Sequence, residues 1–276
     1  MKITASQVNE LRKKTGAGMM DCKKALVEAE GDSELAITIL RKKGQKVAAK
    51  RGENETAEGL VIAKSFDEGA KGVILSLSCE TDFVAKNSEY YDFVETLVDI
   101  AAKNNASSVE ELNACSYDGT ISVQEKITEH VGVVGEKLVL SNFALLNGEA
   151  VVAYNHPGNQ VATMVTLTKG SDEAVDAGKQ VAMQVAAMAP LALSKEGIPE
   201  ATIANEIEIG KELAIKEGKP AEMAEKIAMG RLNKFFKENT LLSQSFIRDN
   251  KKSIEQFLKD TDKDLTVTEF KRFALK

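Results

Sequence analysis

A carboxylate and an aromatic ring stand side by side at Asp82 and Phe83, within the run Glu80-Thr81-Asp82-Phe83-Val84-Ala85-Lys86. Residues 73–79 before this run alternate with a period of two, which is typical of a strand, and residues 88–103 after it are helix-like in composition. The pair is therefore expected on an exposed loop at a strand-to-helix junction, where an exposed hydrophobic side chain usually marks a binding partner. The alternative is that Phe83 turns inward and packs into the core beside the strand.

The residue types that enzymes use form no catalytic pattern in this sequence. The two histidines, His130 and His156, have no Cys, His or carboxylate at the spacing of a metal site. Gly16 and Gly18 lack the third glycine and the Lys-Ser or Lys-Thr pair of a phosphate-binding loop. The sequence therefore predicts a binding or regulatory protein that is not an enzyme, with no cofactor, no metal and no direct nucleotide binding. The alternative is a small-molecule enzyme whose site is assembled from scattered residues, which would need a pocket of perturbed titratable groups.

Charge is distributed unevenly along the chain. The net charge is −6, but residues 1–51 carry 12 Lys and Arg against 6 Asp and Glu. This basic segment contains no aromatic residue on which a nucleic-acid base could stack, and the whole chain is acidic. We therefore do not expect nucleic acid as the partner, and favour an acidic protein surface for the basic segment.

The cysteines and the hydropathy pattern indicate the cellular compartment. Cys22, Cys79 and Cys115 are widely spaced and odd in number, which fits neither a disulfide framework nor a zinc site, so we expect reduced, buried thiols. The sequence has no run of eighteen apolar residues and no secretory segment at its start. These features predict a cytoplasmic protein that does not enter a membrane.

The first 44 residues predict three short helices. Thr4 and Gln7 form a capping box at the start of the first helix, and the segment 15–18, with two glycines, ends it. A second helix is expected over about 20–30, and a third from Asp32 to Gly44. This layout resembles a UBA-like bundle over residues 1–44, followed by a polar linker over residues 45–58.

The remainder predicts an α+β protein with two related subdomains, at 59–140 and 141–276, each an antiparallel three-stranded meander with helices. Asn147-Gly148 is a hairpin signal that would join residues 142–146 to 150–154 as the start of the second meander. Residues 201–237 predict a protruding antiparallel helical hairpin with Ile203, Ile207, Met223 and Ile227 among its inner residues. The alternating run at 265–267 predicts a further edge strand.

Three stretches of this sequence resemble bacterial elongation factor Ts, and the likeness extends over nearly the whole chain. They are Ile3-Thr4-Ala5-Ser6, the run from Thr15 to Leu26 (TGAGMMDCKKAL), and Glu80-Thr81-Asp82-Phe83-Val84-Ala85-Lys86. The resemblance implies a guanine nucleotide exchange factor that binds elongation factor Tu in its GDP-bound and nucleotide-free states. Some members of that family carry a further C-terminal helical module, and contacts made by that module are not expected of this chain.

The resemblance also implies which residues contact elongation factor Tu. Asp82 and Phe83, flanked by Thr81 and Val84, would wedge into its nucleotide-binding domain and disturb the magnesium site and the phosphate-binding loop. The remaining contact positions implied by the resemblance are Arg12, Met19 and Met20 in the bundle, Arg51 after it, Val134 and Gly135 in the first subdomain, and His156 in the second. The alternative function is an RNA- or ribosome-associated binding module that uses the basic N-terminal face, which would bind RNA with a steep salt dependence.

Overall fold

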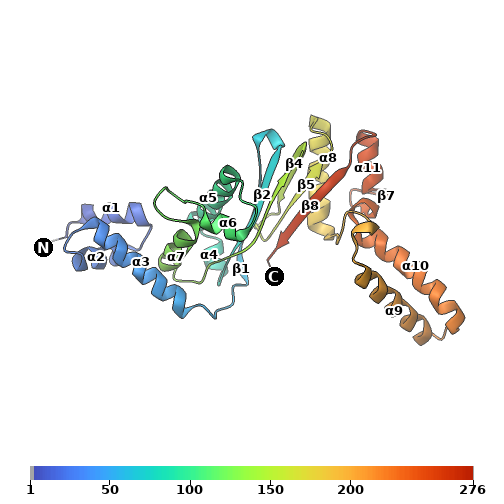
Figure 1. The fold of residues 1–276 in the computed structure, drawn as a ribbon, viewed down its shortest axis with the longest axis horizontal. Helices are drawn as coiled ribbons and strands as arrows, with labels where there is room; N and C mark the ends of the chain where they lie inside the picture. Colours follow the sequence, from blue (N-terminus) through green and yellow to red (C-terminus); the bar gives the residue numbers. More distant parts are fainter. Residues whose placement is uncertain (1–2, 276) are drawn as a thin grey trace.

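The computed structural model describes residues 3–275, apart from the side chains of residues 221 and 222. Its N-terminal end is a small bundle of helices α1 (Ala5–Thr15), α2 (Met19–Glu28) and α3 (Ser33–Lys50) (Figure 1). The predicted capping box is confirmed, because the Gln7 backbone N–H donates to Thr4 Oγ1 and the Thr4 N–H donates to the Gln7 side chain. The bundle core is small and is made of Val8, Leu11, Ala17, Cys22, Ala25, Leu26, Ala29 and Ala36.

Helix α3 is longer than the sequence predicts. It continues through residues 45–50, so the prediction of a linker over 45–58 is wrong for these six residues. Gly44 does not end the helix. Instead it lies against α7, where a Cβ atom on Gly44 would stand 2.9 Å from the Thr128 carbonyl oxygen and one on Gly132 would stand 2.8 Å from Gly44 Cα. The glycine therefore allows two helices to cross closely, which is a long-range requirement with no local signal.

The first antiparallel sheet has the strand order β1-β2-β3. Between β2 and β3 the chain forms four helices that cover one face of this sheet (Figure 1). The elements are β1 (Glu58–Phe66), the short turn η1 (Asp67–Gly69), β2 (Lys71–Cys79), α4 (Asp82–Ala85), α5 (Ser88–Asn104), α6 (Val109–Ala114), α7 (Val123–Val134) and β3 (Val139–Asn147). The largest core cluster lies between this sheet and α5 and α7, with Leu75, Leu77, Tyr90 and Leu97 fully buried.

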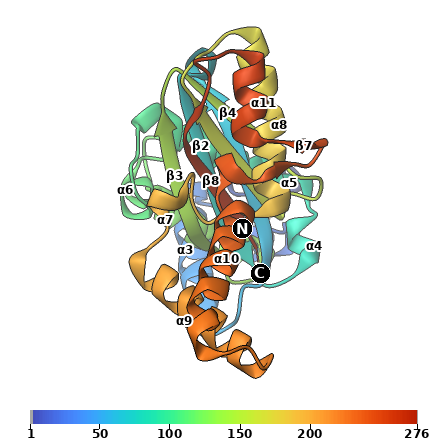
Figure 2. The same cartoon turned by 90° about the vertical axis from the view of Figure 1, so that its right-hand side faces the viewer.

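The second antiparallel sheet has the strand order β4-β5-β8, and α8 and α11 cover its outer face (Figure 2). The predicted edge strand after residue 265 is confirmed as β8, which pairs with β5. The elements are β4 (Ala150–Asn155), β5 (Val161–Leu167), α8 (Asp172–Met188), η2 (Lys195–Gly197), α9 (Glu200–Lys216), α10 (Ala221–Asn239), η3 (Leu241–Ser243), β6 (Ser245–Phe246), β7 (Asp249–Ser253), α11 (Ile254–Thr261) and β8 (Val267–Ala274).

The predicted hairpin at Asn147-Gly148 is wrong. Residues 142–146 belong to β3, which pairs with β2 in the first sheet, whereas β4 pairs with β5 in the second. A two-residue hairpin of the Asn-Gly type needs positive φ at both positions, and neither Asn147 nor Gly148 has it. The dipeptide instead carries the chain from one sheet to the other. The predicted boundary between the two subdomains, after residue 140, falls inside β3.

The two sheets pack face to face and place the helices outside. A shared apolar layer joins Val61, Ala63 and Ile74 of the first sheet to Val151 and Met164 of the second. The sheets approach so closely at Gly72 that a Cβ atom there would stand 2.4 Å from Val151 Cγ1. The free edge of β1 is covered as well, because the Asn155 side chain accepts from the Ala63 N–H and donates to the Ala63 carbonyl, both at 2.8 Å.

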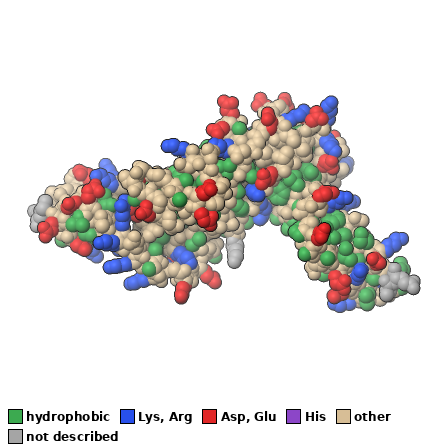
Figure 3. Space-filling view, viewed as in Figure 1, with side chains coloured by type: hydrophobic (Ala, Val, Ile, Leu, Met, Phe, Trp, Pro, Cys, Tyr) green, Lys and Arg blue, Asp and Glu red, His purple; other side chains and the backbone are tan. Residues whose placement is uncertain are grey.

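The predicted helical hairpin is confirmed as α9 and α10, which project from the body of the molecule (Figure 1). Its buried seam is made of small residues and one leucine, namely Gly210, Ala214, Ala224, Ala228 and Leu232. Met223 is wrongly predicted as an inner residue, since it is 52% exposed. A seam of small side chains brings the helices close together and leaves larger apolar side chains outside, and Figure 3 shows these gathered on the hairpin surface.

Candidate functional site

Phe83 projects from the surface on a single helical turn. Residues 82–85, predicted as a loop, form α4, and the Phe83 side chain is 84% exposed. Val84 and Ala85, the next residues, pack against the core cluster of the first sheet and fix the inner side of the turn. The alternative in which Phe83 fills the core is therefore wrong, because Val84 takes the inward position.

The carboxylate of Glu136 holds the start of this turn. It accepts hydrogen bonds from the backbone N–H groups of Glu80 at 3.1 Å and Thr81 at 3.0 Å, and from Thr81 Oγ1 at 2.5 Å. Gly135 makes this reach feasible, because it ends α7 in the left-handed conformation, with φ of 76°, and turns the chain toward Glu136. Val134, just before it, packs partly against the core.

Glu80 makes the reciprocal contact and ties in the end of the bundle. Its carboxylate accepts from the Lys137 N–H at 2.6 Å, from Arg51 Nη1 at 2.7 Å and from Asn54 Nδ2 at 2.8 Å. Burial raises the pKa of Glu80, but the hydrogen bonds from Lys137, Asn54 and Arg51 outweigh it and lower the pKa below its usual range. Lys137 Nζ also donates to the Gly52 and Asn54 carbonyls.

Two groups at the turn, the Asp82 carboxylate and the Cys79 thiol, are each held in one protonation state near neutral pH. The hydrogen bond from Lys86 Nζ, at 2.6 Å, and its positive charge lower the pKa of Asp82, so this carboxylate is ionised beside Phe83. Burial and the nearby Glu136 carboxylate raise the pKa of the Cys79 thiol to about 11. Asp82 therefore presents a negative charge at the surface, and Cys79 is a neutral, buried thiol beneath it.

The bundle presents a second exposed apolar patch. Met19 and Met20 begin α2 and are 53% and 62% exposed, so their side chains do not fill the bundle core. Arg12 lies in the last turn of α1, where it lines an open groove together with Phe93 of α5 and His130 of α7. An exposed pair of methionines is typical of an adaptable protein contact.

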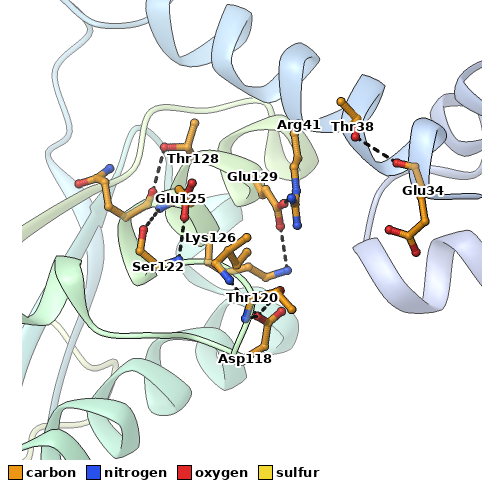
Figure 4. A network of polar contacts seen from close by, with 12 residues as sticks. Glu34, Thr38, Arg41, Asp118, Thr120, Ser122, Glu125, Lys126, Thr128 and Glu129 are labelled. Carbon is orange, nitrogen blue, oxygen red and sulfur yellow. Dashed lines mark hydrogen bonds and ion pairs between the residues drawn. The ribbon is translucent and has the colours of Figure 1, made fainter.

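Polar contacts join the bundle to α7 beside the crossing of Gly44 and Gly132. Arg41 of α3 forms an ion pair with Glu129 of α7, and Lys126 donates to the same carboxylate at 3.2 Å (Figure 4). Helix α7 thus contacts α3 through residues 128–132 and, at its C-terminal end, leads into Glu136. The same helix connects the bundle to the Phe83 turn.

His156 lies in the turn after β4, apart from the network around Phe83. Its Nδ1 lies 3.0 Å from the Tyr154 hydroxyl, and its imidazole is exposed. The Asn159 carbonyl of this turn accepts from the Val61 N–H of β1. Glu58 of β1 pairs with Cys79, just before α4. The His156 turn therefore meets β1 at Val61 and the Phe83 segment meets it at Glu58, roughly 10 Å apart along the strand.

The predicted site residues thus fall into three groups. Arg51, Thr81, Val134 and Gly135 lie in or beside the network that supports Asp82, Phe83 and Val84. Arg12, Met19 and Met20 lie on the bundle, and His156 lies apart in the turn after β4. Sequence reasoning missed the supporting residues Glu80, Asn54, Glu136 and Lys137. Hydrogen bonds among them join positions up to 83 residues apart in the chain. The one available signal was the position of Glu80 directly before Thr81, Asp82 and Phe83.

No helix among residues 3–275 is long and apolar enough to cross a membrane. Within the described part of the chain, the structure also brings together no three His, Cys, Asp or Glu side chains in an arrangement that could hold a metal ion. The exposed Phe83 side chain and the exposed Met19 and Met20 side chains are instead positive features of a surface that binds another macromolecule.

Comparison with known proteins agrees with this interpretation. The family model described as Elongation factor TS matches residues 80–276. Elongation factor Ts of Christiangramia forsetii is 52% identical over 99% of both chains. The proteins of the same name from Amoebophilus asiaticus and Cytophaga hutchinsonii are 48% and 47% identical, each over 99% of this chain and at least 98% of their own. The chain belongs to the elongation factor Ts family, the non-catalytic nucleotide exchange factors of elongation factor Tu in translation elongation.

Proposed function

We propose that this protein releases GDP by inserting the Asp82-Phe83 turn into the nucleotide-binding domain of elongation factor Tu, near the magnesium and phosphate site. The observation that carries this proposal is the 84% exposure of Phe83 on a turn whose neighbours on both sides are held in place. A large aromatic side chain in water gains free energy when a partner buries it, so the turn favours a partner conformation with a matching pocket.

The fixed geometry of the turn supports its use as a wedge. Ordering a flexible side chain or loop on binding costs about 0.5–1.5 kcal/mol per side chain. Here Val84 is already packed and Thr81 is already hydrogen-bonded in the free protein, so little of that cost falls on the complex. The ionised Asp82 would add a negative charge close to the magnesium ion and the phosphate of the partner, where it would disturb the electrostatic interaction between them.

The other predicted contacts would hold the partner while the wedge acts. Arg12, Met19 and Met20 on the bundle are proposed to grip the same domain of elongation factor Tu, together with Arg51. Val134 and Gly135 are proposed to contact it near the wedge, and His156 to touch a different domain. Their support is the family resemblance together with the exposure of the two methionines.

Exchange by this mechanism is a coupling between two sites of elongation factor Tu. If binding of this protein weakens GDP binding by a given factor, GDP must weaken binding of this protein by the same factor. We therefore propose that it binds both the GDP-bound and the nucleotide-free partner, in the cytoplasm, and binds the nucleotide-free form more tightly. The family assignment does not favour the alternative of an RNA-associated module.

The size of the wedge effect follows from the buried area of one phenylalanine. Burying its side chain is worth about 1.5–3 kcal/mol, and each factor of ten in rate requires about 1.4 kcal/mol. Phe83 therefore accounts for roughly one to two factors of ten in the rate of GDP release. The bundle and the second sheet must supply the remainder by holding the partner.

The test is the release rate of a fluorescent GDP analogue from elongation factor Tu at fixed magnesium, with the wild-type protein, with Phe83→Ala and with Ile247→Ala. Ile247 is also an exposed apolar residue, but it lies between β6 and β7. We expect strong acceleration by the wild type, a roughly 10- to 100-fold weaker effect of Phe83→Ala and no change for Ile247→Ala. Full activity of Phe83→Ala would remove the wedge from the mechanism.

A further inference from the structure

We infer that Glu136 is a positioning residue for the exchange reaction: it sets the orientation of the Phe83 turn from outside that segment of the chain. This inference rests on the proposed wedge function and adds a residue to it. Glu136 follows α7, 55 residues after Thr81, and its carboxylate receives hydrogen bonds from two consecutive backbone N–H groups and one hydroxyl at the start of the turn.

The turn needs such external support because it is too short to be stable alone. A helix of four residues has almost no internal hydrogen bonds, and its first N–H groups lack partners within it. Thr81 occupies the capping position, yet its hydroxyl makes no capping bond to the turn and donates to Glu136 instead. The direction of Phe83 relative to the core therefore depends on Glu136 on one side and on the packing of Val84 on the other.

The contact is reciprocal, which distinguishes it from an isolated surface hydrogen bond. Glu136 binds the N–H of Glu80, and the Glu80 carboxylate binds the N–H of Lys137 at 2.6 Å. The two backbone segments thus hold each other through two carboxylates, each with charge-assisted bonds. Arg51 adds a third attachment from the end of α3.

The role of Glu136 is tested by a double-mutant cycle with Phe83. Four proteins are compared in the GDP-release assay at saturating concentration: wild type, Glu136→Ala, Phe83→Ala and the double variant. Binding to nucleotide-free elongation factor Tu and thermal unfolding are measured in parallel. Glu110→Ala is the matched control, because Glu110 is an exposed carboxylate in the same half of the protein, on α6.

If Glu136 acts through Phe83, Glu136→Ala lowers the maximal release rate roughly three- to tenfold, as expected for losing charge-assisted bonds to the backbone. The loss of maximal release rate in Glu136→Ala is no larger than that in Phe83→Ala. The double variant releases GDP no more slowly than Phe83→Ala alone. Glu136→Gln, whose amide oxygen still accepts both N–H bonds, recovers most of the rate. Should Glu136→Ala not fold, Thr81→Val, which removes only the hydroxyl bond, replaces it in the cycle.

Three outcomes overturn the inference, and they are distinguishable from one another. Additive losses in the double variant, with Phe83→Ala itself defective, would mean that Glu136 acts independently of the wedge. An unchanged rate for Phe83→Ala would defeat the wedge itself and the positioning role with it. A fall in unfolding temperature without any change in maximal rate would also contradict the inference, because Glu136 would then be purely structural.

Discussion

Replacing Gly132 by alanine is expected to push the bundle away from the first sheet. A Cβ atom at this position would stand 2.8 Å from Gly44 Cα and 3.3 Å from Gly44 N, both backbone atoms that cannot rotate aside. Carbon atoms pack at about 3.5–4.0 Å, so α3 and α7 must separate by roughly 1 Å. Overpacking of this kind costs about 1–3 kcal/mol, against a gain of about 1 kcal/mol from the higher helix propensity of alanine.

Gly230 provides a matched control in another helix. It lies in α10, is exposed, and a Cβ atom there would have nothing within 4 Å. Gly230→Ala therefore gains the higher helix propensity of alanine without a steric clash. It should raise the free energy of unfolding by up to about 1 kcal/mol. The same chemical change is thus expected to have opposite signs at the two sites.

The assay is thermal unfolding of both variants, followed by GDP release from elongation factor Tu. A change of 1 kcal/mol shifts the unfolding temperature by about 2–4 °C in a protein of this size, so the two variants should differ clearly. We expect Gly132→Ala also to need a higher concentration for half-maximal GDP release, because the bundle is displaced from the Phe83 turn. Stabilisation by both substitutions would refute the close helix crossing.

Two other properties can be checked on the isolated protein. Burial and the nearby charge of Lys126 lower the pKa of His130 to about 4, whereas an unfolded histidine titrates near 6.5. The unfolded state therefore binds more protons between these values, so the free energy of unfolding should fall by up to about 3 kcal/mol as pH decreases from 6.5 to 4. Urea titrations across this range should show that the free energy of unfolding depends less on pH in His130→Phe than in the wild type. An equal pH dependence in the two proteins would contradict its assignment to His130. Asn155→Ala should lower the free energy of unfolding by about 1–3 kcal/mol, because it leaves the Ala63 backbone at the edge of β1 without partners. Asn104→Ala, which loses only a bond within its own helix, is the control, and equal effects of the two would argue against the edge contact.

Local features of the fold could be predicted from the sequence because their causes lie within a few residues. The capping box at Thr4 and Gln7, the periodic apolar residues of the helices and the edge strand after residue 265 are of this kind. The exposed Phe83 was predictable only from the run in which it stands, since a lone phenylalanine at such a junction more often packs inward.

Features that depend on distant partners could not be predicted in the same way. Asn147-Gly148 has the composition of a hairpin, but β3 pairs with β2, and the partner of Asn147 is Lys71, 76 positions earlier. Gly44 has the composition of a helix end, but it is needed for contact with Gly132. In both cases tertiary packing overrides a correct local preference.

The support of the site was missed for the same reason. Glu136 and Lys137 contact residues between 52 and 81, and no local spacing joins these segments. A carboxylate after a helix is an ordinary surface residue until the fold brings an unpartnered backbone segment beside it. The contact residues could be proposed from the motif, but the groups that hold them could not.

In the proposed mechanism, Phe83 couples binding of this protein to the loss of GDP. This coupling is measured by the affinity of the protein for elongation factor Tu with and without saturating GDP. The wild-type protein should bind the nucleotide-free partner far more tightly than the GDP-bound partner. In Phe83→Ala the ratio of the two affinities should shrink by roughly 10- to 100-fold, with the loss confined to the nucleotide-free complex. An unchanged ratio in Phe83→Ala would contradict the wedge mechanism.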